Sequence, residues 1–205
     1  MERRLATQAA TVFLVLVAAC SDTPVEPEQT AEIAGPSFAA VQKTTADVHP
    51  IVGEAPDFGT DLGDSRINRT KNGINVNFRT TGLTPGYAYT LWAIIFNDGD
   101  ATNDEGAFDA ARIVAGHVAG GSGMVTFSGR VKANDGGGEL FGELTNPEGA
   151  EVHLVVRCHG PKDPEFMPDQ ISTFGGGCTP GSSFGIGDGP YPCTEPQVAI
   201  HPSAS

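Results

Sequence analysis

Three histidines at the ends of two predicted strands are the first candidates for chemistry in this chain. The pattern of residues 151–159 (EVHLVVRCH) places His153 and His159 on the face away from the apolar side chains, and that of residues 197–201 (QVAIH) places His201 on the same outer face. Imidazoles on adjacent strands can hold zinc or copper, so these three predict a transition-metal site. The alternative is that each is solvated or hydrogen-bonded by itself, because no H-x-H or H-x-x-x-H pair is present.

The densest run of oxygen ligands lies in the segment NDGDATNDEGAFD. It contains Asp98, Asp100, Asp104 and Glu105, and carboxylates at this density can bind Ca²⁺. The spacing departs from an EF-hand loop, because Asn103 stands at the sixth position, where that loop requires glycine. A solvated acidic turn is therefore the competing interpretation.

Residues 178–193 (CTPGSSFGIGDGPYPC) form a glycine-rich segment with one notable serine and two aromatic residues. The GSSFG string around Ser183 matches G-x-S-x-G, which surrounds the nucleophilic serine of α/β-hydrolases. No helix is predicted after it, so we reject that chemistry. Phe184 and Tyr191 predict a binding loop for glycans or for another envelope protein. The alternative is that both rings fold back on the protein.

The cysteines stand at positions 20, 158, 178 and 193. Cys158 shares a predicted inward face with apolar side chains, where an unpaired thiol behaves as a small hydrophobic group. Cys178 and Cys193 bracket the glycine-rich segment, and a bridge between them would close a loop of about 15 residues. We therefore expect a Cys178–Cys193 disulfide and a free Cys158, in a compartment that allows disulfides to form.

The chain from Ser65 onward predicts an all-β domain. Short apolar runs alternate with turns rich in glycine and proline, and no segment carries a helical stripe long enough to predict a helix. The predicted strands are residues 73–78, 87–96, 111–131 as a hairpin turning at Gly120–Gly123, 139–144, 151–159, 170–174 and 197–201. We expect an antiparallel β-sandwich of the immunoglobulin or fibronectin type, or a related Greek key, with a closed barrel as the alternative.

Two resemblances support this expectation. Residues 82–89 (GLTPGYAY) resemble the segment before a late strand of fibronectin type III domains, which implies that Tyr89 forms a tyrosine corner, its hydroxyl bonded to the loop backbone. More broadly, GLTPGYAYTLWAIIFN, GAEVHLVVRCHGP and QISTFGGGC resemble a group of secreted or lipid-anchored bacterial proteins. That resemblance covers most of residues 65–202 and implies the fold but no activity.

The first 19 residues have the composition of a leader that is removed. Two arginines precede an apolar run, Ala9–Ala19, that is shorter than the roughly 20 residues of a spanning helix. Residues 17–20 (VAAC) resemble the lipobox of bacterial lipoproteins, in which the cysteine, here Cys20, is acylated and becomes the N-terminus. Because Ser21 and not aspartate follows it, the resemblance implies an outer-membrane anchor.

Residues 20–64 are rich in Pro, Glu, Thr and Ala, so we expect a flexible tether there and the β-domain at 65–205. The whole chain has a charge of −13, and this acidity argues against binding nucleic acid. We expect a lipid-anchored extracytoplasmic protein that serves as a binding or envelope-structural module rather than an enzyme. The alternative is a metal-binding protein or metal-dependent enzyme that uses the three histidines.

Overall fold

The structure, a computed structural model, describes residues 41–102, 107–137 and 140–204 of the chain. Its helical elements in these residues are two short 3-10 turns, η1 (Asp169–Ile171) and η2 (Pro180–Ser182). No helix of the described residues is long and apolar enough to cross a membrane. The predicted leader and Cys20 lie outside the described residues.

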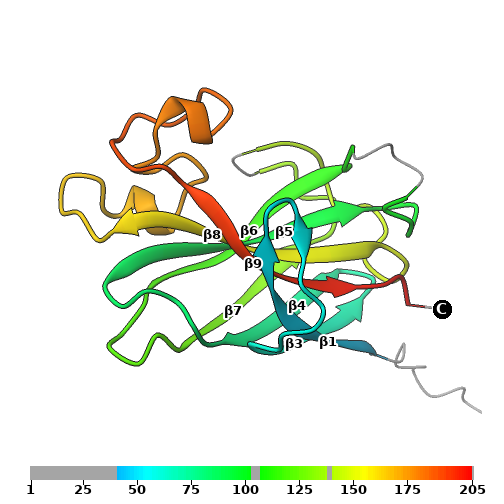
Figure 1. Ribbon diagram of the computed structural model, residues 1–205. Helices are drawn as coiled ribbons and strands as arrows, with labels where there is room; N and C mark the ends of the chain where they lie inside the picture. The colour runs from blue at the N-terminus through cyan, green and yellow to red at the C-terminus, as the bar shows by residue number, and fades with distance from the viewer. Residues whose placement is uncertain (1–40, 103–106, 138–139, 205) are drawn as a thin grey trace, which may run out of the picture. The chain divides into compact units, whose positions relative to one another are not determined.

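Nine strands form one antiparallel sheet in the described part of the chain (Figure 1). They are β1 (Gln42–Val52), β2 (Ala55–Pro56), β3 (Gly63–Thr70), β4 (Gly73–Thr80), β5 (Tyr87–Phe96), β6 (Ala110–Val118), β7 (Val125–Lys132), β8 (Glu151–Pro161) and β9 (Thr194–His201). Their order is β6-β5-β8-β9-β1-β3-β4-β7, and β2 pairs with β1. The expected all-β, antiparallel class is confirmed.

The two end strands of this sheet, β6 and β7, approach each other closely. Gly129 of β7 permits the approach, since a Cβ atom there would lie 2.1 Å from the carbonyl oxygen of Val114 in β6. β1 joins the two halves of the sheet: its residues 42–48 pair with β3, whereas His49 and Pro50 pair with β9. The fold is a nearly closed barrel, which fits the expected alternative, and the sandwich is not confirmed.

The apolar side chains of β4 and β5 form much of the interior: β4 buries every second side chain, and β5 buries side chains on both of its faces. In β4, Ile74, Val76 and Phe78 are buried, whereas the asparagines between them are exposed, as the sequence predicts. β5 buries side chains on both faces. Leu91 belongs to the hydrophobic core, and Trp92, on the opposite face, is only 1% exposed. A second layer must therefore cover the outer face of β5.

The predicted tyrosine corner is present at the start of β5. The hydroxyl of Tyr89 accepts a hydrogen bond from the backbone N–H of Thr84 at 2.9 Å, and the ring is buried. This bond ties the loop before β5 to the strand itself.

The predicted hairpin over residues 111–131 is wrong in its pairing. Both strands exist, but β6 pairs with β5 and β7 pairs with β4. The glycine turn between them forms, with Gly123 N–H donating to Gly120 O at 3.0 Å. It connects the two ends of the sheet, so the strands meet across the seam of the barrel without a ladder in the described residues.

Two other predicted strands are not strands in the structure. In residues 170–174, the first two lie in η1, because the side chain of Gln170 donates to the carbonyl oxygens of His159 and Pro161 and draws the backbone into a turn. The described part of residues 139–144 forms isolated bridges only.

The predicted tether is folded in its C-terminal part, so the domain boundary at 65 is wrong. β1 begins at Gln42 and lies between β9 and β3, and β3 begins at Gly63. The strand character of β1 is weak in the sequence, because its inward face carries small residues such as Thr44 and Ala46 before it reaches the buried Val48.

Candidate functional site

The segment between β8 and β9, residues 162–193, lies against the outer face of β5 and β8 and is drawn gold to orange in Figure 1. The pairing of β8 with β9 shifts register between Val156 and Cys158. Arg157 and His159 of β8 are both buried beneath this segment. A strand therefore supplies two polar side chains to the floor of a loop.

Arg157 fastens the loop to the sheet from below. Its Nε donates to the carbonyl oxygen of Phe174 at 2.9 Å, and its Nη2 donates to that of Ser182 at 2.6 Å. Its Nη1 pairs with the carboxylate of Glu195 on β9. The guanidinium also lies 3.7 Å from the centroid of the Phe174 ring. These contacts satisfy a buried cation that would otherwise cost several kcal/mol.

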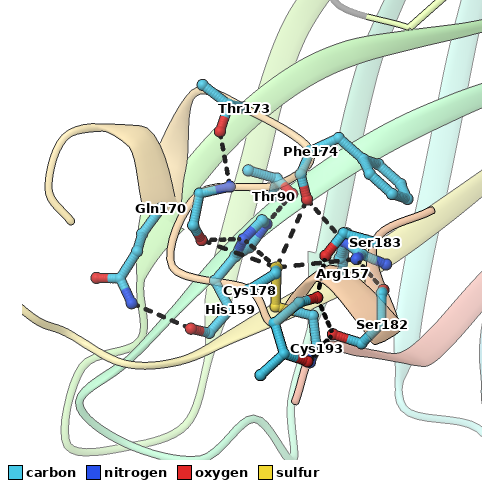
Figure 2. The surroundings of a disulfide bond; sticks show 12 residues. Thr90, Arg157, His159, Gln170, Thr173, Phe174, Cys178, Ser182, Ser183 and Cys193 are labelled. Atoms are coloured by element: carbon cyan, nitrogen blue, oxygen red, sulfur yellow. Dashed lines mark hydrogen bonds between the residues drawn. A yellow bond between two sulfur atoms is a disulfide. The ribbon is translucent and has the colours of Figure 1, made fainter. Parts of the chain in front are cut away.

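The predicted Cys178–Cys193 disulfide is present and closes a loop, residues 178–193, within this segment. Cys158 is the free cysteine of the described residues. Figure 2 shows the disulfide with its neighbours. The Sγ of Cys178 lies 3.4 Å from His159 Nδ1 and 3.8 Å from Arg157 Nη2. The bridge and the two polar side chains together hold both ends of the loop against the barrel.

His159 is a neutral, fully hydrogen-bonded imidazole. Because the carbonyl oxygen of Gly176 can only accept, Nδ1 carries the proton and donates to it at 2.9 Å. Nε2 then accepts from the hydroxyl of Thr90 at 2.7 Å, and that hydroxyl accepts from Trp92 Nε1 at 2.8 Å. Burial, with a smaller effect from Arg157, lowers the pKa of His159 to about 4. The imidazole is therefore structural at neutral pH.

An apolar groove of about 270 Å³ lies beside this buried centre. Its walls come from β5, β8, β9, the 162–193 segment, the connection before β6 and the connection between β7 and β8. The side chains that line it are Trp92, Ile94, Phe108, Leu140, Phe141, Val155, Arg157, Phe174, Phe184 and Glu195. We call this the aromatic groove.

The rim of the aromatic groove carries exposed rings. Phe184 is 90% exposed and Phe141 is 49% exposed. Phe184 stacks on Phe174 with ring centroids 5.9 Å apart, and Phe141 stacks on Phe108 at 4.9 Å. Phe184 also has a φ of 53°, a left-handed conformation that few non-glycine residues adopt. A bulky apolar side chain is thus held outward at a local backbone cost.

The polar side chains of the aromatic groove have partners inside the protein. Arg157 and Glu195 are paired with each other, and the indole N–H of Trp92 donates to Thr90. What the groove presents to a ligand is therefore mainly ring faces and aliphatic groups.

Tyr191, the second predicted binding residue, has a structural role. Its hydroxyl donates to Asp163 Oδ2 at 2.7 Å, and its ring packs near Phe166 at a centroid distance of 6.3 Å. It also fills the space beside Gly160, where a Cβ atom would lie 2.7 Å from the ring. Of the two residues predicted for the binding loop, Phe184 is therefore the one whose ring faces solvent.

The three predicted histidine ligands do not come together. His153 and His159 lie six positions apart on β8, a span of roughly 20 Å. His153 bonds to Glu151 Oε1 at 2.6 Å, and His201 has separate partners. Among the described residues, the one group of three side chains with metal-binding atoms close together is His159, Cys178 and Cys193, and its two sulfurs are bonded to each other.

The face inferred for His201 was also wrong. In the structure His201 is opposite the buried Val152 and points inward, and its ring lies between Thr44 Oγ1 at 3.0 Å and Ser65 Oγ at 2.8 Å. Burial first, then the charge of Arg69, lowers its pKa to about 3. The inner face of β9 therefore includes polar side chains such as His201, whereas a prediction from hydrophobic periodicity places polar side chains on the outer face.

The predicted calcium loop is described only in part, because Asp104 and Glu105 lie outside the described residues. Asp98 Oδ1 accepts from the N–H of Asp100 at 3.0 Å, and Asp100 Oδ1 accepts from the N–H and hydroxyl of Thr102 at 2.8 and 2.6 Å. In the described half of the loop these carboxylates order a turn.

Ser183 does not have the surroundings of a nucleophile. It is fully buried, and its hydroxyl donates to the carbonyl oxygen of Thr179 at 2.9 Å. The rejection of hydrolase chemistry at the GSSFG string agrees with this geometry.

Sequence reasoning missed most of the aromatic groove. Phe108, Phe141 and Phe174 lie in three separate connecting segments, so no spacing links them to Trp92. One signal was available. The apolar run of β5 predicts cover on both faces, and Trp92 and Ile94 are the large residues that such cover must meet.

Comparison of the chain with protein-family models, with curated proteins and with solved structures finds no match. The lipobox and the resemblance to secreted or lipid-anchored bacterial proteins therefore stay predictions.

Proposed function

We propose that the protein is an exported, lipid-anchored binding protein whose barrel holds a small, neutral, apolar molecule in the aromatic groove. The observation that carries the proposal is the outward, backbone-strained Phe184 at the rim of a groove walled by rings. Exposed apolar surface of this kind costs free energy in water, and soluble proteins usually keep it where something binds.

The chemistry of the walls selects the ligand class. A glycan needs hydrogen-bond partners, but the polar side chains here, Arg157 and Glu195, already satisfy each other. A neutral apolar molecule needs only contact with rings. The groove, at about 270 Å³, is larger than the roughly 150 Å³ cavity that accepts benzene, so a molecule of one or two rings fits its size.

The sequence supports the location. The leader, the VAAC string ending at Cys20 and the serine that follows predict an acylated protein on the outer membrane of a bacterium. An apolar-ligand site carried at a membrane surface would meet the small apolar molecules that partition there. The histidine-based metal function is not proposed, because its three ligands are dispersed.

Trp92 provides a direct test, since it is the single tryptophan of the chain and lines the groove. The probe is N-phenyl-1-naphthylamine, a neutral dye that fluoresces in apolar surroundings, added to the mature chain with Cys20→Ser to prevent acylation. We expect saturable binding with energy transfer from Trp92, and displacement by neutral aromatic compounds but not by oligosaccharides.

A matched pair of variants makes the test specific. Phe184→Ala should weaken dye binding by about tenfold, because one aromatic contact contributes about 1 kcal/mol beyond its area. Phe58→Ala removes another exposed ring, between β2 and β3, and should leave binding unchanged. If both variants bind like the parent, or if oligosaccharides displace the dye, the proposal is wrong. Palmitate labelling of the native chain, lost in Cys20→Ser, tests the anchor separately.

A further inference from the structure

Arg112 on β6 is a buried cation whose surroundings differ from those of the other buried arginines. It stands opposite Ala93, a core residue of β5, so its side chain starts on the inner side of the sheet. The residue is only 6% exposed. Its Nη1 has no hydrogen-bond partner among the described residues, and none of them forms an ion pair with it.

The other buried arginines show what the protein normally provides. Both terminal nitrogens of the Arg69 guanidinium donate to backbone carbonyl oxygens, three in all, although its Nε has no partner among the described residues. Arg157 donates to two carbonyl oxygens and pairs with Glu195. Buried polar atoms are almost always satisfied, and a buried guanidinium without a partner is strongly unfavourable. Arg112 differs in that a terminal nitrogen of its guanidinium, Nη1, has no partner among the described residues, and such a group favours a partner of opposite charge.

Arg112 borders a cavity of about 120 Å³ at the seam between β6 and β7. Arg130 and Lys132 of β7 line the same cavity, together with Asp135. The carboxylate of Asp135 is engaged by the N–H of Gly137 at 3.2 Å. Three cations against one carboxylate leave the cavity positively charged.

This clustering is not a consequence of composition. The chain has 12 Lys and Arg against 25 Asp and Glu, so three cations around one small cavity run against its overall charge. The seam supplies the space, because β6 and β7 approach there without a hydrogen-bonded ladder in the described residues. The guanidinium of Arg130 is oriented by its own hydrogen bond, in which Nη2 donates to Asn72 O at 3.3 Å.

We propose that this cavity binds a small oxyanion of the phosphate or sulfate class, with Arg112 as its buried ligand and Arg130 and Lys132 at its mouth. A guanidinium presents parallel N–H donors that match two oxygens of such an anion, and two further cations offset its second charge. The site is separate from the aromatic groove and does not depend on the function proposed for it.

Titration calorimetry in chloride buffer of low ionic strength tests the proposal on the mature chain. The probes are inorganic phosphate, sulfate and phenyl phosphate, and we expect one site per chain. Binding of the inorganic anions alone indicates a free anion, whereas binding of phenyl phosphate as well indicates a phosphate ester such as a lipid headgroup. Either outcome supports the site, and no heat from any probe at millimolar concentration overturns it.

Variants separate the site from general salt effects. Phosphate that binds only the folded protein raises its melting temperature. Arg112→Met should abolish both the binding and this rise. Methionine is chosen because an apolar replacement leaves no new polar group in the interior. Arg130→Gln with Lys132→Gln should weaken binding at least tenfold without unfolding the protein, because both are exposed. Arg66→Gln with Lys43→Gln removes the same charge from β3 and β1 and should leave binding within twofold. Equal losses in the two double variants would overturn the proposal.

Discussion

The guanidinium of Arg157 holds both the ring and the backbone of Phe174. Its central carbon lies 3.7 Å from the ring centroid, and its Nε donates to the carbonyl oxygen of the same residue at 2.9 Å. The Phe174 ring in turn stacks on Phe184. One side chain of β8 therefore positions, through a single intermediate ring, the most exposed aromatic residue of the aromatic groove.

Replacing Arg157 should destabilise the protein more than any surface change. Arg157→Met removes the guanidinium that donates to the carbonyl oxygens of Phe174 and Ser182 and that pairs with Glu195, so we expect the free energy of unfolding to fall by about 3 kcal/mol. Urea unfolding measures it. Arg66→Met, at an exposed position on β3, should change it by less than about 0.5 kcal/mol. Similar losses in both would show that the contacts of Arg157 contribute little.

Removing the disulfide should loosen the groove as well as the fold. Cys178→Ser with Cys193→Ser opens a loop of 15 residues in sequence separation, and we expect a loss of about 3 kcal/mol. Dye binding should weaken too, since Phe184 lies inside that loop. Cys158→Ala, which removes the free thiol, is the comparison and should leave dye binding unchanged. Unaltered dye affinity in the double serine variant would mean that other contacts alone hold Phe184.

Acid should destabilise the protein through two buried histidines. The folded protein holds His159 and His201 neutral, with pKa values of about 4 and about 3, against 6.5 for the free group. Below pH 6.5 the unfolded state binds protons that the folded state does not, so the stability present above pH 6.5 is lost as the pH falls towards these folded pKa values. Each histidine should contribute a slope of about 1.4 kcal/mol per pH unit in that window.

Variants check the origin of this pH dependence. His201→Gln and His159→Gln should each flatten the slope of unfolding free energy between pH 6 and about 4, measured by urea unfolding at each pH. His117→Gln, at an exposed position on β6, should not. If the slope of unfolding free energy against pH persists when both histidines are replaced together, the pH dependence comes from carboxylates.

The closure of the barrel should depend on Gly129. A methyl group there would clash with the backbone of β6. We expect Gly129→Ala to destabilise the fold by roughly 1–3 kcal/mol and so to lower the melting temperature by several degrees. Gly120→Ala is the matched control, because nothing lies within 4 Å of the added Cβ there. Scanning calorimetry compares them, and equal melting temperatures would show that the seam can open without cost.

How far the sequence predicts this fold differs from strand to strand. β4 and β5 carry strong apolar patterns, and both are found where expected. β1 escapes prediction because its inward side carries small residues, Thr44 and Ala46, before the buried Val48. β6 and β7 are recognised as strands, but their partners are not, since periodicity describes one strand at a time and pairing depends on how the whole sheet curves.

The sequence by itself determined the all-β class and the Cys178–Cys193 bridge, because the first depends on local patterns and the second on few alternatives. The tyrosine corner at Tyr89 followed from the resemblance of residues 82–89 to fibronectin type III domains. Only the tertiary structure decided that the histidines separate, that the rings of the aromatic groove gather, and that Arg112 Nη1 has no hydrogen-bond partner among the described residues. These features join residues from distant segments, and their geometry is set by register shifts and by the seam of the barrel, which leave no spacing signal in the chain.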